Sequence, residues 1–168
     1  MREEYDVVQD RFLQDYLNKI GNRLAATAPA RDSGFPFSFT LVNHSEVNAF
    51  ALPGGPMFVF TGLVKEADSE GQSAGVMAHE MSHVILRHGT NQASKAEILQ
   101  LPAMLASQAT GGGSLWGQLL QFGIGLGYNS VLLKFSRTDE SEADALGTRI
   151  MASAGYNPIR NGGLLRKA

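Results

Sequence analysis

The sequence predicts an α+β domain, in which helices are segregated around one small sheet. Apolar residues alternate with polar ones, or run in short stretches, between positions 37 and 60. On both sides of that region they recur at helical spacing. The chain has 168 residues, 43% of them hydrophobic and 18% charged, which is enough for one core. We therefore expect residues 1–168 to form a single domain.

An amphipathic helix is predicted over residues 5–28. Apolar side chains recur there at helical spacing with charged residues between them, and Ala28-Pro29 is expected to end the helix. The apolar positions are Val8, Phe12, Leu13, Tyr16, Leu17, Ile20 and Leu24.

Three strands are predicted next. Phe37, Phe39 and Leu41 alternate with polar residues, as in a half-buried strand. Residues 47–52 and 57–60 form two further strands around a turn that begins at Pro53 and ends at Pro56. Because proline is confined to sheet edges and turns, we expect this hairpin at an edge of the sheet.

The pattern becomes helical from Thr61 onward. Ser69 and Gln72 form a predicted capping box for a helix that runs to about His88. Further helices are expected over 92–108 and over 130–153, the latter ending at Gly155, and Asn157-Pro158 begins one more short helix. The glycine-rich residues 110–127 between them predict a loop.

Composition excludes several functions. Lys and Arg number 14 and Asp and Glu 16, so the net charge of −2 provides no basic surface for nucleic acid. The chain contains no cysteine, which excludes a disulfide framework, a thiolate metal site and a thiol nucleophile. The N-terminus has no signal-peptide pattern, and the longest apolar run, 115–126, is interrupted by glycine and too short for a bilayer span. We expect a soluble domain.

The most informative motif is His79-Glu80-Met81-Ser82-His83. Residues four apart on a helix differ by only about 40°, so His79 and His83 can present two imidazoles to one ion. Glu80 lies at the edge of that face, where it can accept a proton from a water on the metal. The alternative is a pair of core histidines, but two buried imidazoles and a carboxylate need partners that a metal supplies together.

A third ligand is required, because catalytic zinc usually takes three protein ligands and a water. His88 lies about 140° from the ligand face if the helix continues, so we expect it to point away. A pattern with a histidine six residues after His83 fails, because that position is Gly89. His44 precedes a predicted strand and is expected to be an ordinary loop histidine.

A carboxylate is the better candidate. Glu140 and Asp144 are four apart in the acidic run 136–144, so both can face one point. Glu140 would coordinate the metal, and Asp144 would accept the second N–H of a ligand histidine. The alternative is a solvated acidic helix face.

With these motifs the chain resembles the gluzincin family that includes HtpX heat-shock proteases, CAAX prenyl proteases and periplasmic BepA-like peptidases. The resemblance covers nearly the whole chain and rests on residues 48–55, 78–88 and 136–147. It implies a zincin-like fold, with HExxH and ExxxD motifs on helices and an edge strand lining the cleft, and one Zn²⁺ per chain. The family pattern selects Glu140 over Glu142 as the ligand.

The resemblance also implies a location and a boundary. Because the sequence contains no predicted membrane span, the chain most resembles the soluble branch of this family, whose members lie in the periplasm or cell envelope. Relatives continue beyond the equivalent of Ala168, so we expect the full protein to have further C-terminal residues. An oxyanion-stabilising residue is not identified, and Arg137 is either a contact for Asp144 or substrate, or a plain surface residue.

The predicted reaction is zinc-dependent hydrolysis of internal peptide bonds, with Glu80 as the base. The edge strand, at Asn48, Ala49, Phe50 and Ala51, would bind substrate as an added strand. That mode suits unfolded or misassembled envelope proteins. The alternative is a zinc-stabilised, chaperone-like domain that holds unfolded chains without cleaving them. An exopeptidase is a further alternative, but no group is assigned to hold a chain end.

The glycine-rich segment 110–127 is the remaining expectation. It combines glycines with large apolar residues, among them the only tryptophan, Trp116. We expect it to cover the cleft as a lid or to make a peripheral membrane contact, with a permanently packed connector as the alternative.

Overall fold

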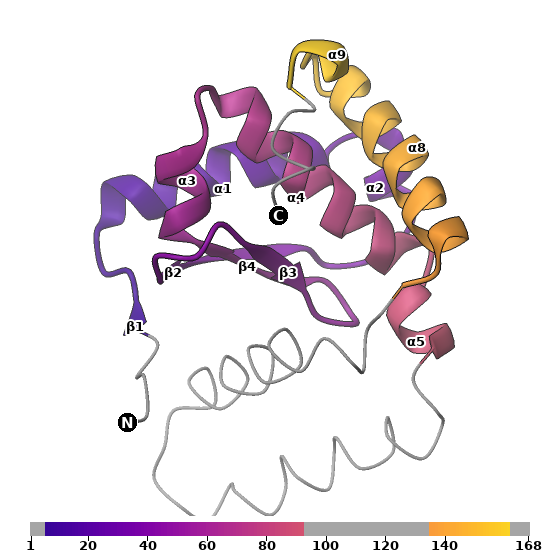
Figure 1. The fold of residues 1–168 in the computed structure, drawn as a ribbon, viewed down its shortest axis with the longest axis horizontal. Coiled ribbons are helices and arrows are strands. Elements are labelled where there is room, and N and C mark those ends of the chain that lie inside the picture. Colours follow the sequence, from indigo (N-terminus) through magenta and orange to yellow (C-terminus); the bar gives the residue numbers. More distant parts are fainter. Residues whose placement is uncertain (1–5, 93–134, 162–168) are drawn as a thin grey trace, which may run out of the picture.

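The computed structural model describes residues 6–92 and 135–161, which form a mixed α+β fold around one sheet (Figure 1). The sheet order is β1-β2-β4-β3. The central strands β2 and β4 are parallel, and the outer strands pair with them antiparallel. The predicted α+β class with one small sheet is confirmed. The strands are β1 (Asp6–Val7), β2 (Ser38–Asn43), β3 (Ala49–Ala51) and β4 (Pro56–Phe60).

Helices gather on one side of this sheet. α1 and α4 lie over one face, and α8 runs along the outer side of α4 (Figure 1). Within the described residues, none of the helices has the length and apolar character needed to cross a membrane. The helices are α1 (Arg11–Ala25), α2 (Ala28–Arg31), α3 (Thr61–Glu66), α4 (Glu70–Ile85), α5 (His88–Gln92), α8 (Arg137–Ser153) and α9 (Pro158–Asn161).

Two hydrophobic clusters lie on opposite faces of the sheet. Successive strand residues point to opposite faces, so Met57 and Val59 join the helices in the main core, whereas Phe58 and Phe60 belong to a smaller cluster. The main core contains the buried face of α4, including Met77. The helix that carries the HExxH motif is therefore anchored in the most buried part of the domain.

The predicted hairpin is present, and β3 is one of the two edge strands of the described sheet. Gly54 and Gly55 make its turn with φ values of 99° and 115°, a region that favours glycine. β4, however, is a central strand. The edge prediction therefore holds for the first arm of the hairpin only.

The predicted N-terminal helix starts too early. Residues 6–7 pair with β2, and Asp10 caps α1 by accepting hydrogen bonds from the N–H groups of Phe12 and Leu13 at 2.9 and 3.2 Å. Phe12 is 79% exposed and Leu13 36% exposed, so neither belongs to the core. Helical spacing indicates a face, but the cap decides where the helix begins.

The start of α4 follows the prediction, but its cap and its end differ. Ser69 is the N-cap residue without a side-chain cap hydrogen bond, and Gln72 Oε1 instead accepts from Asp68 N–H at 2.8 Å. The helix ends at Ile85 rather than near His88. Arg87 then takes a left-handed φ of 60°, which turns the chain.

The helix predicted over 130–153 begins instead at Arg137. Ser136 and Asp139 form a reciprocal capping box that defines this start. The predicted stop is confirmed, because Gly155 has a φ of 81°, and Asn157 caps α9 by accepting from Ile159 N–H at 3.0 Å. The predicted helix 92–108, apart from Gln92 in α5, and the predicted lid 110–127 lie outside the described residues.

Candidate metal centre

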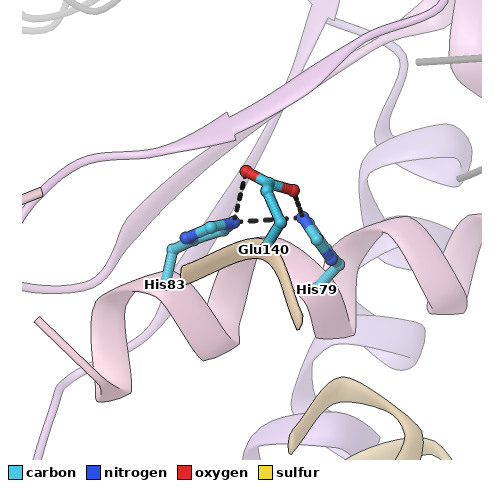
Figure 2. A group of neighbouring side chains, drawn as sticks. All are labelled: His79, His83 and Glu140. Carbon is cyan, nitrogen blue, oxygen red and sulfur yellow. Dashed lines mark hydrogen bonds and ion pairs between the residues drawn. The ribbon is translucent and has the colours of Figure 1, made fainter. Parts of the chain in front are cut away.

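Two imidazoles face one another on the buried helix α4. The Nε2 atoms of His79 and His83 lie 3.0 Å apart (Figure 2). Ala78 and Met81, beside them on the helix, are fully buried, so the helix cannot rotate away from this orientation without unpacking the core. The four-residue spacing therefore brings both nitrogens to one point.

Glu140 reaches the same point from the first turn of α8. Its Oε2 lies 3.3 Å from His79 Nε2, and its Oε1 lies 3.7 Å from His83 Nε2. The capping box at Ser136 begins α8 one turn before Glu140, and this start aims the carboxylate at α4 (Figure 2). The three side chains form a group of potential metal ligands.

The spacing of these donors fits a zinc ion. Ligand atoms at about 2.0–2.1 Å from a tetrahedral zinc stand roughly 3.3 Å from one another. The three observed separations are 3.0, 3.3 and 3.7 Å. Two imidazole nitrogens and a carboxylate are also a common donor set of catalytic zinc sites, which leave a fourth position open.

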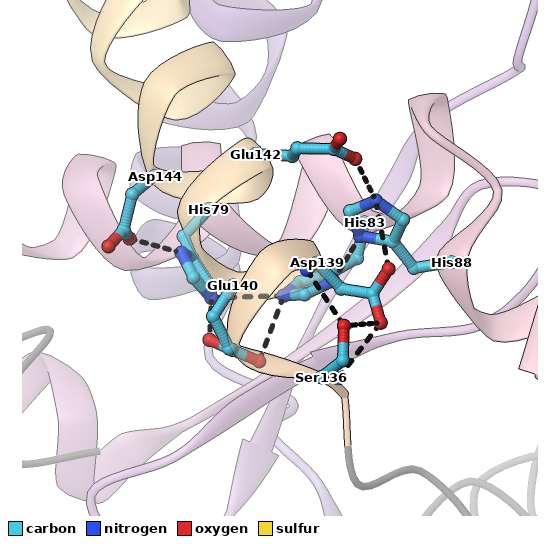
Figure 3. A network of polar contacts seen from close by, with 8 residues as sticks. All are labelled: His79, His83, His88, Ser136, Asp139, Glu140, Glu142 and Asp144. Carbon is cyan, nitrogen blue, oxygen red and sulfur yellow. Dashed lines mark hydrogen bonds and ion pairs between the residues drawn. The ribbon is translucent and has the colours of Figure 1, made fainter.

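Asp144 completes the contacts of His79. Its Oδ1 lies 2.9 Å from His79 Nδ1, on the side of the ring away from Glu140 (Figure 3). A carboxylate only accepts hydrogen bonds when ionised, so His79 Nδ1 carries the proton and Nε2 offers a lone pair to the ligand group. Asp144 lies where its spacing from Glu140 predicts, and its effect on metal binding stays a prediction.

His83 is buried and neutral. Burial is the main cause that lowers the pKa of His83 to about 3; the neighbouring imidazoles of His79 and His88 act in the same direction, and Asp139 opposes them. The Phe135 ring stacks on the imidazole with centroids 4.0 Å apart. Metal ligation requires a neutral imidazole, so the environment of His83 holds it in the form that a metal needs.

Glu80 is the second group at the centre whose pKa is shifted. Burial, together with the negative charge of Glu140, raises the pKa of Glu80 to about 8. It follows His79 on α4 but is not one of the three converging ligands. A bound cation would favour the ionised carboxylate and so oppose both effects. Glu80 thus lies in the electrostatic field of the centre without occupying a ligand position.

The predicted direction of His88 is wrong. Because α4 ends at Ile85 and Arg87 turns the chain, His88 folds back, and its Nδ1 lies 2.9 Å from Nδ1 of His83. Glu142 Oε2 lies 3.2 Å from His88 Nε2, so Glu142 belongs to a second acidic group and not to the first. Extrapolating helix geometry past a helix end caused the error.

The remaining candidates lie elsewhere. His44 is in the loop after β2, with its ring 4.7 Å from that of Phe60, and takes no part in the centre. Arg137 is exposed at the start of α8. Asn48 directly precedes β3, which Ala49, Phe50 and Ala51 form.

Two contributors were missed by sequence reasoning. Phe135 precedes the helix cap and gave no signal. Gly147 lies in the interface of α8 with α4. The sequence did contain a signal for it: Ala143, Gly147 and Ile150 recur at the spacing of one helix face, and the first two are small enough for a close helix contact.

The described residues combine three features that are typical of metallopeptidase domains. These are two histidines one turn apart on a buried helix, a glutamate from a second helix, and a small sheet with an edge strand. The chain belongs to peptidase family M48, whose sequence profile matches residues 12–164. The fold and the site therefore define the described chain as a domain of a peptidase family.

Named relatives agree with this assignment. The chain is 32% identical to the beta-barrel assembly-enhancing protease of Escherichia coli K12, over 94% of this chain and 33% of the relative. It is 31% identical to the protein of the same name in Yersinia pestis, over 99% of this chain and 35% of the relative. The mitochondrial metalloendopeptidase OMA1 of Schizosaccharomyces pombe is 32% identical, over 85% of this chain and 40% of the relative. The chain thus spans about a third of the length of the first two relatives.

Proposed function

We propose that this domain is a zinc-dependent endopeptidase whose zinc is held by His79, His83 and Glu140. The observation that carries the proposal is the convergence of these three donors at 3.0–3.7 Å beside Glu80. A zinc ion bound there supplies Lewis acidity, which polarises the scissile carbonyl and acidifies water.

The protein's own residues supply base and orientation. Glu80 takes the proton from the attacking water and delivers it to the leaving amine. Asp144 holds His79 in the tautomer that directs its Nε2 at the ligand group. Burial of α4 keeps the ligand histidines in place without a rearrangement on binding.

Substrate is proposed to bind as an added strand on β3. The carbonyl of Asn48 accepts from Phe60 N–H at 3.0 Å, and Leu52 N–H donates to the carbonyl of Pro56 at 2.7 Å. Hydrogen-bonded positions alternate in antiparallel pairs, so the main-chain groups of Ala49 and Ala51 turn away from β4. Ala51 is the more exposed of the two and offers the more accessible pair.

Main-chain hydrogen bonding of this kind depends little on the side chains of the substrate, which suits unfolded or misassembled polypeptides. We place these substrates and the protein in the periplasm or cell envelope. Relatives named for beta-barrel assembly support that location, whereas relatives named as mitochondrial point to another compartment. Cell fractionation of the native protein would show which of these two locations it has.

The direct test compares two isosteric variants of the zinc-loaded protein on an unfolded substrate such as casein. Glu80→Gln should bind one zinc per chain yet lower cleavage by at least about 100-fold, since it removes a base and no ligand. Glu140→Gln should lose zinc affinity itself. Asp15→Asn, exposed on α1, is the matched control. If wild-type protein binds casein and zinc but never cleaves, the chaperone-like alternative holds instead.

A further inference from the structure

His88 connects the centre to a second group of acidic side chains. Its Nδ1 lies 2.9 Å from Nδ1 of His83. Its Nε2 lies 3.2 Å from Glu142 Oε2 and 3.8 Å from Asp139 Oδ1 (Figure 3). Only 3% of His88 is exposed. A buried imidazole of this kind requires a partner of the right polarity at each nitrogen.

Those contacts determine where the protons lie. The carboxylates near His88 Nε2 can only accept, so this nitrogen carries the N–H. A neutral His88 then presents a lone pair at Nδ1, and the proton shared by the two Nδ1 atoms belongs to His83. His83 Nε2 is consequently a lone pair, directed at Glu140 and His79.

We propose that Glu142 and His88 form a hydrogen-bond relay that fixes the tautomer and ring orientation of His83 as a metal ligand. Both are positioning residues, since neither reaches the ligand group itself. The relay does for His83 what Asp144 does for His79, but it acts through one additional imidazole. The inference depends on the ligand set proposed above.

A second cation site is the competing interpretation, because His88, Asp139 and Glu142 are suitable ligands. A cation on His88 Nε2 would move the proton of His88 to Nδ1. His88 would then donate that proton to His83 Nδ1. The proton of His83 would consequently lie on its Nε2, and this nitrogen could no longer bind the metal. Occupation of one site therefore opposes occupation of the other. Asp139 is moreover engaged with Ser136, whose N–H and Oγ lie 2.9 and 2.8 Å from its Oδ2.

The backbone is bent to build this relay. Arg87 adopts a φ of 60°, and α5 begins immediately afterwards at His88. A left-handed conformation is unfavourable for a residue other than glycine. Without this turn, a continued helix would carry His88 away from His83, so the strained residue is what brings the two rings together.

Zinc affinity measured by chelator competition on the full chain tests the relay. His88→Phe keeps the ring but removes the acceptor, and we expect zinc affinity to fall by roughly 10–100-fold. His88→Asn retains an acceptor near Nδ1 and should recover affinity to within about fivefold of wild type. Glu142→Ala, at an exposed position, should weaken binding by about threefold or more, whereas the neighbouring exposed Ser141→Ala should not.

The tautomers provide an independent readout. ¹⁵N NMR of the zinc-loaded protein should show the N–H of His83 at Nδ1 and that of His88 at Nε2. A His88 proton at Nδ1, zinc on His88, or wild-type affinity in both His88→Phe and Glu142→Ala would overturn the relay. If Glu140→Gln and His83→Gln both leave zinc binding unchanged, the ligand set fails first. The two failures are thereby distinguishable.

Discussion

Gly147 of α8 lies against the backbone of His79 on α4. A Cβ placed on Gly147 would stand 3.2 Å from the His79 nitrogen and 3.3 Å from the carbonyl of Ala78. Those distances are tighter than ordinary contact, so the glycine allows the two motif-bearing helices to approach each other. We expect this close approach to determine the distance between the Glu140 carboxylate and the two histidine rings.

Gly147→Ala should therefore weaken zinc binding, by roughly tenfold, because α8 must shift away from α4. The substitution also raises helix propensity by about 1 kcal/mol, which acts in the opposite direction on stability. Zinc competition and thermal unfolding measured together separate the effects. Thr148→Ala, exposed on the same helix, is the control. A stabilised variant with wild-type zinc affinity would contradict the proposed role.

Asp144 should contribute to zinc affinity through His79. Asp144→Ala removes the acceptor at 2.9 Å and should cost up to about 100-fold in affinity, whereas Asp144→Asn keeps an acceptor oxygen and should cost about tenfold. Zinc titration checks both. Unchanged titrations with unchanged turnover would assign Asp144 to the surface, where 63% of its side chain is exposed.

Ala51 should contribute to substrate binding without affecting zinc. Ala51→Pro removes an N–H that faces away from β4, so the β3–β4 ladder is retained while one hydrogen bond to an added strand is lost. We expect KM for an unstructured peptide to rise by up to about tenfold, the effect of one such bond. Ala51→Ser keeps the N–H and is the control. An unaltered KM, with peptide binding elsewhere, would exclude strand addition at β3.

Tyr156 should stabilise the domain in a way that alkali removes. Its hydroxyl donates to Glu70 Oε1 at 2.6 Å, and its ring lies under Arg23. Burial, with the hydrogen bond to Glu70 next, raises the pKa of Tyr156 to about 12. Because the folded pKa exceeds the unfolded value of about 10, this stabilisation is complete below pH 10 and is lost as pH rises towards 12.

Tyr156→Phe should therefore lower stability at pH 7 by about 1 kcal/mol. It should also remove the part of the alkaline destabilisation that Tyr156 causes. Denaturant unfolding of both proteins at pH 7, 10 and 11.5 measures this difference. A stability gap that stays constant across the three pH values would show that the hydroxyl does not titrate with folding.

The fold class, several turns and part of the candidate site could be predicted from the sequence alone. The α+β class, the hairpin with β3 as its edge arm, and the turn at Gly155 depend on local periodicity, proline and glycine, whose conformational effects act over a few residues. The pairing of His79 with His83 on one face also follows from helix geometry. Resemblance to a family supplied the choice of Glu140 over Glu142.

Only the tertiary structure decided which groups meet. Asp144 and His79 are 65 positions apart, and His88 and Glu142 are 54 apart, so their contacts depend on how α8 packs on α4. Two local events set that geometry, the left-handed turn at Arg87 and the capping box at Ser136. Helical periodicity describes the faces of a helix but not its ends. Because His88 lies just beyond such an end, its contact with His83 became visible only in the folded chain.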